Sequence, residues 1–144
     1  MSGRRAGQQC LLRRIPIFLI PGLVVLFSMT IVIAQEGLLD GKVFVGQSKE
    51  KHIRTVKEDE LRFMNGEFHS LGYGQRGFKK GVYTAKADAD KIYFEAETVN
   101  PKQGKIKWRG IVHGDSIEVN YHWSKKGWFS DTEKDYSFKG ILKK

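Results

Sequence analysis

From Gly41 onward, hydrophobic and polar residues alternate along most of the chain, which is the period-two pattern of half-buried β-strands. Asn65-Gly66 interrupts this pattern between two short alternating runs. An Asn-Gly pair in that position is a strong signal for a two-residue hairpin turn. The pairs that this turn predicts are Phe63 with Phe68 on one face and Arg62 with His69 on the other.

A second two-residue turn is predicted at Gly114-Asp115. It places four pairs on one face, and every member of these pairs is apolar or glycine. Such consistency over four successive pairs favours a real hairpin with one buried face. The predicted pairs are Val112 with Ile117, Gly110 with Val119, Trp108 with Tyr121, and Ile106 with Trp123.

The neighbouring connections can be examined in the same way, by asking whether the residues that each loop places opposite each other are compatible. A loop from Asn100 to Gly104 opposes small to large side chains, as the interior of a curved sheet requires, and it opposes acidic to basic residues on the other face. The loop pairs Ala96 with Trp108, Phe94 with Gly110, Glu95 with Arg109, and Glu97 with Lys107. A loop from Ala87 to Asp90 pairs Tyr83 with Phe94 and Ala85 with Ile92. Tyr136, Phe138, Gly140 and Leu142 are expected opposite Trp123, Tyr121, Val119 and Ile117.

With a first strand over Lys42–Gly46, the pattern predicts an all-β domain of about eight strands in an antiparallel up-and-down meander. We expect the last strand to pair with the first, because closure removes the exposed edges. The segment from Ser48 to Glu60 fits either a further strand or a short helix.

In such a meander the connections alternate between two ends. The tight turns then share one end, and the longer loops share the other end, where barrels of this kind bind ligands. The aromatic rows should point inward and the charged rows toward water, the reverse of an outer-membrane barrel. The loops expected at the open end are Gln47–Asp59, Leu71–Lys79, Asn100–Gly104 and Lys125–Lys134.

The N-terminal segment differs from the rest. Ile15–Ile33 is apolar apart from Ser28 and Thr30, and four arginines precede it. This arrangement is typical of a secretory signal, with cleavage after Ala34, although the run is also long enough for a retained membrane anchor. Both interpretations divide the chain into a signal peptide or anchor (residues 1–34) and a β-barrel domain (residues 35–144). Both place the domain outside the cytoplasm, in a periplasmic or extracellular location.

The charge and the cysteine content of the domain exclude several classes of function. Four of the 25 basic residues lie in the first 34 residues, which leaves 21 basic against 16 acidic side chains in the domain. The one cysteine, Cys10, is also in the leader, so the domain has neither a disulfide nor a thiol nucleophile. Nucleic-acid binding is not expected, because the aromatic residues are predicted to face inward rather than beside the lysines.

Three stretches carry the resemblance of this chain to a known architecture: Gly41–Gly46, the Asn-Gly hairpin, and Tyr136–Gly140. Together they resemble the calycin-type barrels of lipocalins and avidins. The segments Gly81–Ala85, Ile92–Thr98 and Lys105–Gly110 are similar to those of small exported bacterial barrel proteins of uncharacterised function. This resemblance covers roughly residues 38–144 and implies a fold and a compartment, but no catalytic residue. The Gly-X-Trp signature of lipocalins is absent, and Phe44 stands near its place.

No motif predicts catalysis, a metal or a cofactor. Gly72–Gly77 matches G-x-G-x-x-G, but a strand follows where a dinucleotide site needs a helix, so we interpret it as a glycine-rich loop at the mouth. The four histidines lack metal-binding spacing. The prediction is a non-catalytic barrel that binds a small apolar ligand. The alternative is an envelope protein without a ligand whose long loops contact a protein or a membrane.

The candidate residues for the two hypotheses come from the inward rows and from the long loops. Lys125–Phe129 fits either a membrane contact or a lid over the ligand entrance, and we favour a structural arrangement in which its two aromatic rings fold back onto the core. The ligand-lining candidates are Phe63, Phe94, Trp108, Tyr121, Trp123 and Phe138. The loop or lid candidates are Tyr73, Phe78, Trp128 and Phe129.

Overall fold

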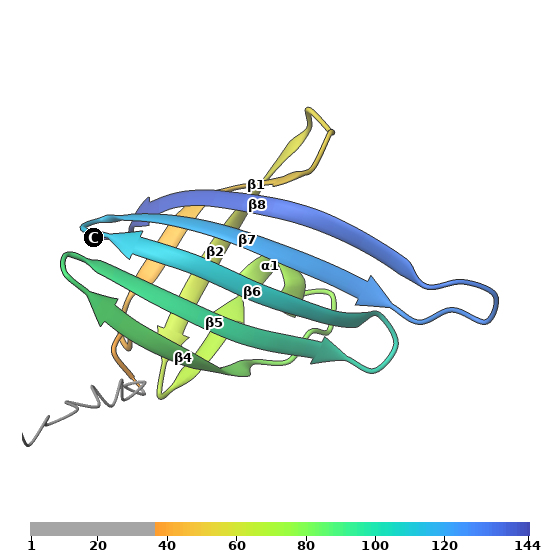
Figure 1. The fold of residues 1–144 in the computed structure, drawn as a ribbon, viewed down its shortest axis with the longest axis horizontal. Coiled ribbons are helices and arrows are strands. Elements are labelled where there is room, and N and C mark those ends of the chain that lie inside the picture. The colour runs from red at the N-terminus through yellow and green to blue at the C-terminus, as the bar shows by residue number, and fades with distance from the viewer. Residues whose placement is uncertain (1–36) are drawn as a thin grey trace, which may run out of the picture. The chain divides into compact units, whose positions relative to one another are not determined.

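The computed structural model describes residues 37–144, which form a closed barrel of eight antiparallel strands in sequence order (Figure 1). The all-β up-and-down prediction is confirmed, and the predicted N-terminal signal or anchor helix lies outside the described residues. One helical turn, α1 (Leu71–Gly74), follows the third strand. The strands are β1 (Val43–Glu50), β2 (Val56–Met64), β3 (Glu67–Ser70), β4 (Gly81–Asp88), β5 (Lys91–Asn100), β6 (Gly104–His113), β7 (Ser116–Lys125) and β8 (Thr132–Leu142).

Three of the predicted hairpin registers are confirmed. The β2–β3 turn pairs Phe63 with Phe68, and the β5–β6 connection pairs Phe94 with Gly110. The β6–β7 turn pairs Trp108 with Tyr121, as its glycine-aspartate signal indicates. In each case the local turn sequence fixes the register, and the inward-facing rows follow from it.

Two predicted registers are wrong by two residues. Tyr83 pairs with Ala96 rather than with Phe94, because the turn between β4 and β5 contains only Ala89 and Asp90. Tyr136 pairs with Tyr121 rather than with Trp123, because β7 and β8 extend further before they turn. A shift of two residues keeps every side chain on its predicted face, so the alternation pattern does not distinguish the two registers.

The undecided segment from Ser48 to Glu60 is neither a helix nor a separate strand. It contains the end of β1, a connection over residues 51–55, and the start of β2. The last strand pairs with the first along seven residue pairs, including Ser48 with Phe138, so the predicted closure is confirmed. The tight turns lie at one end, called the closed end, and the connections 51–55, 71–80, 101–103 and 126–131 lie at the other, called the looped end.

The residues that precede β1 fill the closed end. Leu39 is fully buried, and its backbone N–H donates a hydrogen bond to the Tyr83 hydroxyl (3.0 Å). That hydroxyl donates to a carboxylate oxygen of Asp40 (2.7 Å), which also accepts from the backbone N–H of Gly66 in the β2–β3 turn (3.0 Å). Burial is the main cause that raises the pKa of Tyr83 to about 12. The polar chain fixes the segment in place, and Leu39 completes the core.

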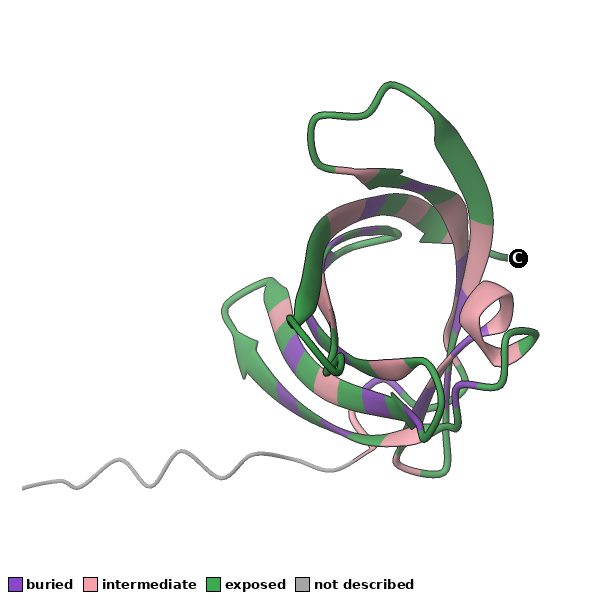
Figure 2. Cartoon of the chain, turned by 90° about the vertical axis from the view of Figure 1, so that its right-hand side faces the viewer, coloured by how far each residue is buried: buried purple, intermediate pink, exposed green. Residues whose placement is uncertain are grey.

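Buried and exposed residues alternate along the strands (Figure 2). Strand β6 shows the pattern without interruption: Ile106, Trp108, Gly110 and Val112 are buried, and the residues between them are exposed. The apolar rows therefore face inward and the charged rows face water. Between residues 37 and 144, no helix has the length and apolar content needed to cross a bilayer.

Candidate functional site

Aromatic rings fill the closed half of the barrel. Phe63 lies at the centre, with ring centroids 4.9 Å from Phe94, 5.1 Å from Tyr83, 5.2 Å from Phe68 and 6.2 Å from Phe44. All five side chains are at most 1% exposed. Edge-to-face and tilted contacts at these distances are those of a packed core, so this half of the interior offers no room for a ligand.

A column of stacked rings leads from this core toward the looped end. The Trp108 ring stacks on Tyr121 (centroids 4.2 Å apart, 29° between planes), and Tyr121 stacks on Tyr136 (5.0 Å, 7°). Tyr73 of α1 packs edge-on against both Trp108 and Tyr121. Tyr136 is half-buried, so the column ends near solvent.

At the end of the column lies a cleft of about 130 Å³, between the β1–β2 hairpin and α1. We call it the mouth cleft. Its walls include two rings of the column, inward-facing positions of β1 and β2, and the turn that follows α1. The residues on which its chemistry depends are Ser48, Lys57, Asp59, Arg76, Tyr121 and Tyr136.

Asp59 positions the wall that α1 contributes. Its carboxylate accepts hydrogen bonds from the Ser70 hydroxyl (2.6 Å) and from the backbone N–H of Gly72 (2.8 Å). The Ser70 hydroxyl in turn accepts from the backbone N–H of Tyr73 (3.2 Å), which makes Ser70 the N-cap of α1. These bonds hold the helical turn against β2 and direct the Tyr73 ring over the column.

The hydroxyls at the cleft are held in their protonated form. Burial raises the pKa of Tyr73, Tyr121 and Tyr136, so all three remain hydrogen-bond donors at neutral pH. The Tyr73 and Tyr121 hydroxyls lie 3.3 Å apart and share a hydrogen bond. Ser48 is 8% exposed, and its hydroxyl is close enough to that of Tyr121 to lower the pKa of the tyrosine, in opposition to burial. No hydrogen bond of ordinary geometry links the Ser48 hydroxyl to the described residues, so this buried polar group is only weakly satisfied.

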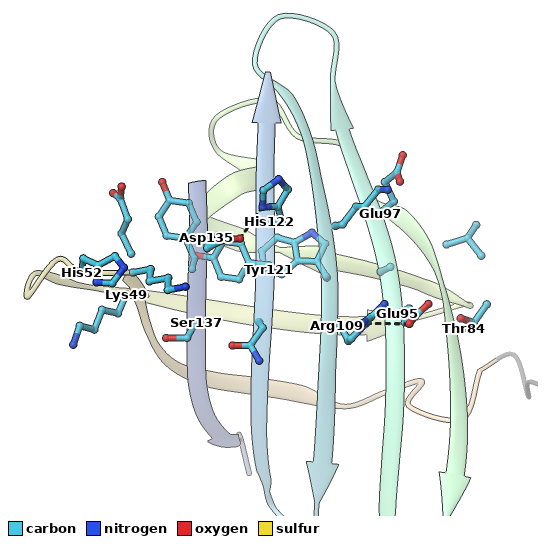
Figure 3. Close-up of a pocket in the computed structure, with 18 residues that line it drawn as sticks. Lys49, His52, Thr84, Glu95, Glu97, Arg109, Tyr121, His122, Asp135 and Ser137 are labelled. Carbon is cyan, nitrogen blue, oxygen red and sulfur yellow. Dashed lines mark hydrogen bonds and ion pairs between the residues drawn. The ribbon is translucent and has the colours of Figure 1, made fainter. Parts of the chain in front are cut away.

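A larger hollow, of about 1200 Å³, lies on the outer face of β4–β8 and the end of β1 (Figure 3). Its walls are two rows of outward-facing polar side chains, and its floor is the strand backbone between them. Some of the charges along it form exposed pairs, such as Arg109 with Glu95 (3.1 Å) and His122 with Asp135 (2.7 Å). Exposed pairs of this type are ordinary features of a solvated sheet, so this outer groove does not define a site.

The structure brings the six ligand-lining candidates onto the inner face but not around one cavity. Phe63, Phe94, Trp108 and Phe138 are at most 2% exposed and belong to the packed core. Trp123 is partly buried near the looped end, where its indole N–H donates to the backbone carbonyl of Gln103 (2.7 Å). Of the six, Tyr121 alone lines the mouth cleft.

The lid candidates divide into two pairs. Tyr73 and Phe78 close over the interior, with Phe78 5% exposed and its ring 5.5 Å from that of Tyr73. Trp128 and Phe129 are fully exposed, at 100% and 101%, so the expectation that they fold back onto the core is wrong. They lie in the β7–β8 connection, which projects past the neighbouring loops and makes no contact that would bury them (Figure 1).

The glycine-rich motif forms a one-turn helix and the turn after it rather than an open loop. Gly74 packs against the His69 ring, where a Cβ atom would lie 2.3 Å from the nearest ring carbon. The motif therefore has a packing role here. Within the described part of the chain, no group of three His, Cys, Asp or Glu side chains is arranged to hold a metal ion.

Sequence reasoning missed most of the mouth cleft. Ser48, Lys57 and Asp59 lie in the segment whose structure it left open, and Arg76 follows a helical turn that it did not predict. Tyr136 was placed in an inward row, but the wrong register put it opposite Trp123 and away from Tyr121. Comparisons with protein-family models, with curated proteins and with solved structures found no match.

Proposed function

We propose that this protein is a non-catalytic binding protein that takes one ring-sized, largely apolar group into its mouth cleft. The observation that carries this proposal is the stacked column of Trp108, Tyr121 and Tyr136, which ends at the cleft. A planar group placed there continues the stack, because offset and parallel ring contacts are favourable at these spacings.

The size of the cleft limits the ligand. A cavity of roughly 150 Å³ holds a benzene-sized molecule, and pockets for drug-sized ligands measure about 300–1000 Å³. The mouth cleft measures about 130 Å³. It therefore fits a single ring, either as a free small molecule or as a side chain of a larger partner. A larger apolar ligand inside the barrel is not supported, because the core is packed.

The experiment titrates the purified full-length chain with two monocyclic probes, benzyl alcohol and benzamide. Binding is monitored by NMR through the backbone amide chemical shifts. We expect shifts confined to the mouth cleft and dissociation constants of about 1 mM, as suits so few ligand atoms. Replacing Tyr136→Leu removes the end of the column and should weaken binding. The matched control, Tyr93→Leu, changes a tyrosine on the outer face that is 39% exposed. Shifts scattered over the surface, or equal losses in both variants, would refute the proposal.

A second candidate function rests on Trp128 and Phe129. Two fully exposed aromatic side chains beside Lys125 and Lys126 favour a contact with an anionic membrane or a protein partner through the β7–β8 connection. The test is the tryptophan emission of the full chain with and without phosphatidylglycerol vesicles. A blue shift that the Trp128→Ala/Phe129→Ala variant loses supports membrane contact, and its retention by that variant refutes it.

The same proposal places the protein outside the cytoplasm and among calycin-like barrels. Export is supported by the apolar run Ile15–Ile33 and its flanking arginines. The eight-stranded meander with an aromatic interior is compatible with a calycin-like relationship. Membrane fractionation of the native host, with a protease-protection assay, tests the location.

A further inference from the structure

Two inward-facing charged residues at the looped end lie on β2, which pairs with β1. The pair Phe44–Leu61 is fully buried. Its face is shared by the residues two and four positions after Phe44 on β1 and two and four positions before Leu61 on β2. Lys57 therefore faces inward opposite Ser48, and Asp59 faces inward opposite Gly46. Strand alternation thus brings one ammonium and one carboxylate to the wall of the mouth cleft.

The carboxylates at the cleft are already engaged. Asp59 accepts hydrogen bonds from the Ser70 hydroxyl and from the backbone N–H groups of Gly72 and Glu60, at 2.6–2.8 Å. Glu50 lies 3.2 Å from the ammonium group of Lys134. Glu58, which borders the cleft from the outward face of β2, accepts from Gln47 (3.3 Å). None of the three is left without a donor.

The cations at the cleft are not engaged in the same way. Among residues 37–144, neither Lys57 nor Arg76 has a carboxylate oxygen within 4.0 Å. The Arg76 guanidinium instead lies over the Tyr73 ring, 5.2 Å from its centroid. Arg76 and Tyr136 both line the mouth cleft, so the guanidinium lies close to the end of the aromatic column. Burial and the Glu50 carboxylate raise the pKa of Tyr136, and the charges of Lys134 and Arg76 partly oppose that rise.

From this arrangement we infer that the ring bound in the mouth cleft carries an anionic substituent, such as a carboxylate. The ring stacks on Tyr136, and the anionic group meets Arg76 and Lys57 at the rim. Charge-assisted hydrogen bonds from a guanidinium to a carboxylate are stronger than those between neutral groups. This inference rests on the proposed function, because it names the chemical class of the ligand for the same site.

The experiment compares three monocyclic probes of similar size on the full-length chain: benzoate, neutral benzamide and cationic benzylamine. We expect benzoate to bind about tenfold more tightly than benzamide, and benzylamine to bind more weakly than both. The advantage of benzoate should decrease as salt is added, because Arg76 and Lys57 are exposed. The Arg76→Gln variant should lose most of the preference for benzoate, because only Lys57 remains, with its affinity for benzamide unchanged.

The control variant is Arg54→Gln, which removes an exposed charge from the β1–β2 connection without changing the cleft lining. It should keep the preference for benzoate. If benzamide binds at the cleft as tightly as benzoate, or if Arg54→Gln and Arg76→Gln lose the preference equally, the anionic inference is overturned and the proposed function stands. If no probe shifts the cleft resonances, both are overturned.

Discussion

Substitution of Gly110 tests how tightly the core is packed, because the lack of a side chain at this position makes room for the Phe94 ring. A Cβ atom at position 110 would lie 2.3 Å from Phe94 Cε1 and 2.9 Å from Phe94 Cζ. The same atom would lie 3.0 Å from the backbone carbonyl oxygen of Glu118. In a Gly110→Ala variant, either the Phe94 ring or the β6–β7 backbone must move.

The Phe94 ring has little freedom to move. Its centroid lies 4.9 Å from that of Phe63 and 5.6 Å from that of Phe68. An added methyl group in a packed core costs about 1–3 kcal/mol, and we expect the middle of this range after allowing for the lower chain entropy of alanine. A change of about 2 kcal/mol lowers the melting temperature of a domain of this size by about 8 °C.

Urea denaturation of the wild type and four variants measures the effect. The Arg109→Ala control alters the neighbouring position, where the side chain is 80% exposed, and should change stability by less than about 0.5 kcal/mol. The other variants are Gly110→Ala, Phe94→Leu and the double variant, in which the smaller residue relieves the clash. We expect the double variant to be at least about 1 kcal/mol more stable than the sum of the single effects predicts. A neutral Gly110→Ala variant, or strict additivity, would refute the packing argument.

Two further predictions concern polar groups. Thr98→Val should lower the free energy of unfolding by about 1–3 kcal/mol, because it removes the acceptor of the buried Trp108 indole N–H (2.9 Å). Thr98→Ser keeps a hydroxyl at this position and should retain most of the stability. Urea denaturation of both variants measures the difference. The hydrogen bond to Asp135 raises the pKa of His122 above 6.5, so the stability that this pair contributes is present below pH 6.5 and is lost as the pH rises through the raised value. An NMR titration midpoint for the His122 ring at or below 6.5 would contradict this prediction.

The sequence predicted faces more reliably than registers. Phe94 and Gly110 were placed opposite each other because a short loop at Asn100–Gly104 fixes their strands, and the structure confirms the pair. The β4–β5 register was wrong because its turn uses Ala89, which has a positive φ of 53° without being glycine or asparagine. No local residue marks that turn, and a slip of two residues leaves the pattern of apolar positions unchanged.

The candidate site shows the same division. Residues that make contacts along one hairpin, such as Trp108 and Tyr121, were predicted to be neighbours. Contacts that depend on closure of the barrel were not, because they join β1 and β2 to β8 or to α1 across long stretches of chain. The cleft beside Tyr136 and Ser48 depends on such contacts. The burial of Leu39 next to Tyr83 is also long-range, because it joins the segment before β1 to β4.

The alternation of residue types and the turn residues by themselves determined that this chain forms an antiparallel meander with an aromatic inner face. These features are local, since each strand displays its buried face every second residue and each glycine turn sets one pairing. Only the tertiary structure decided that rings fill the closed half and leave a ring-sized cleft at the looped end. It also decided that Trp128 and Phe129 remain in solvent. How much space is left between side chains depends on their mutual packing across the barrel, and no single strand contains that information.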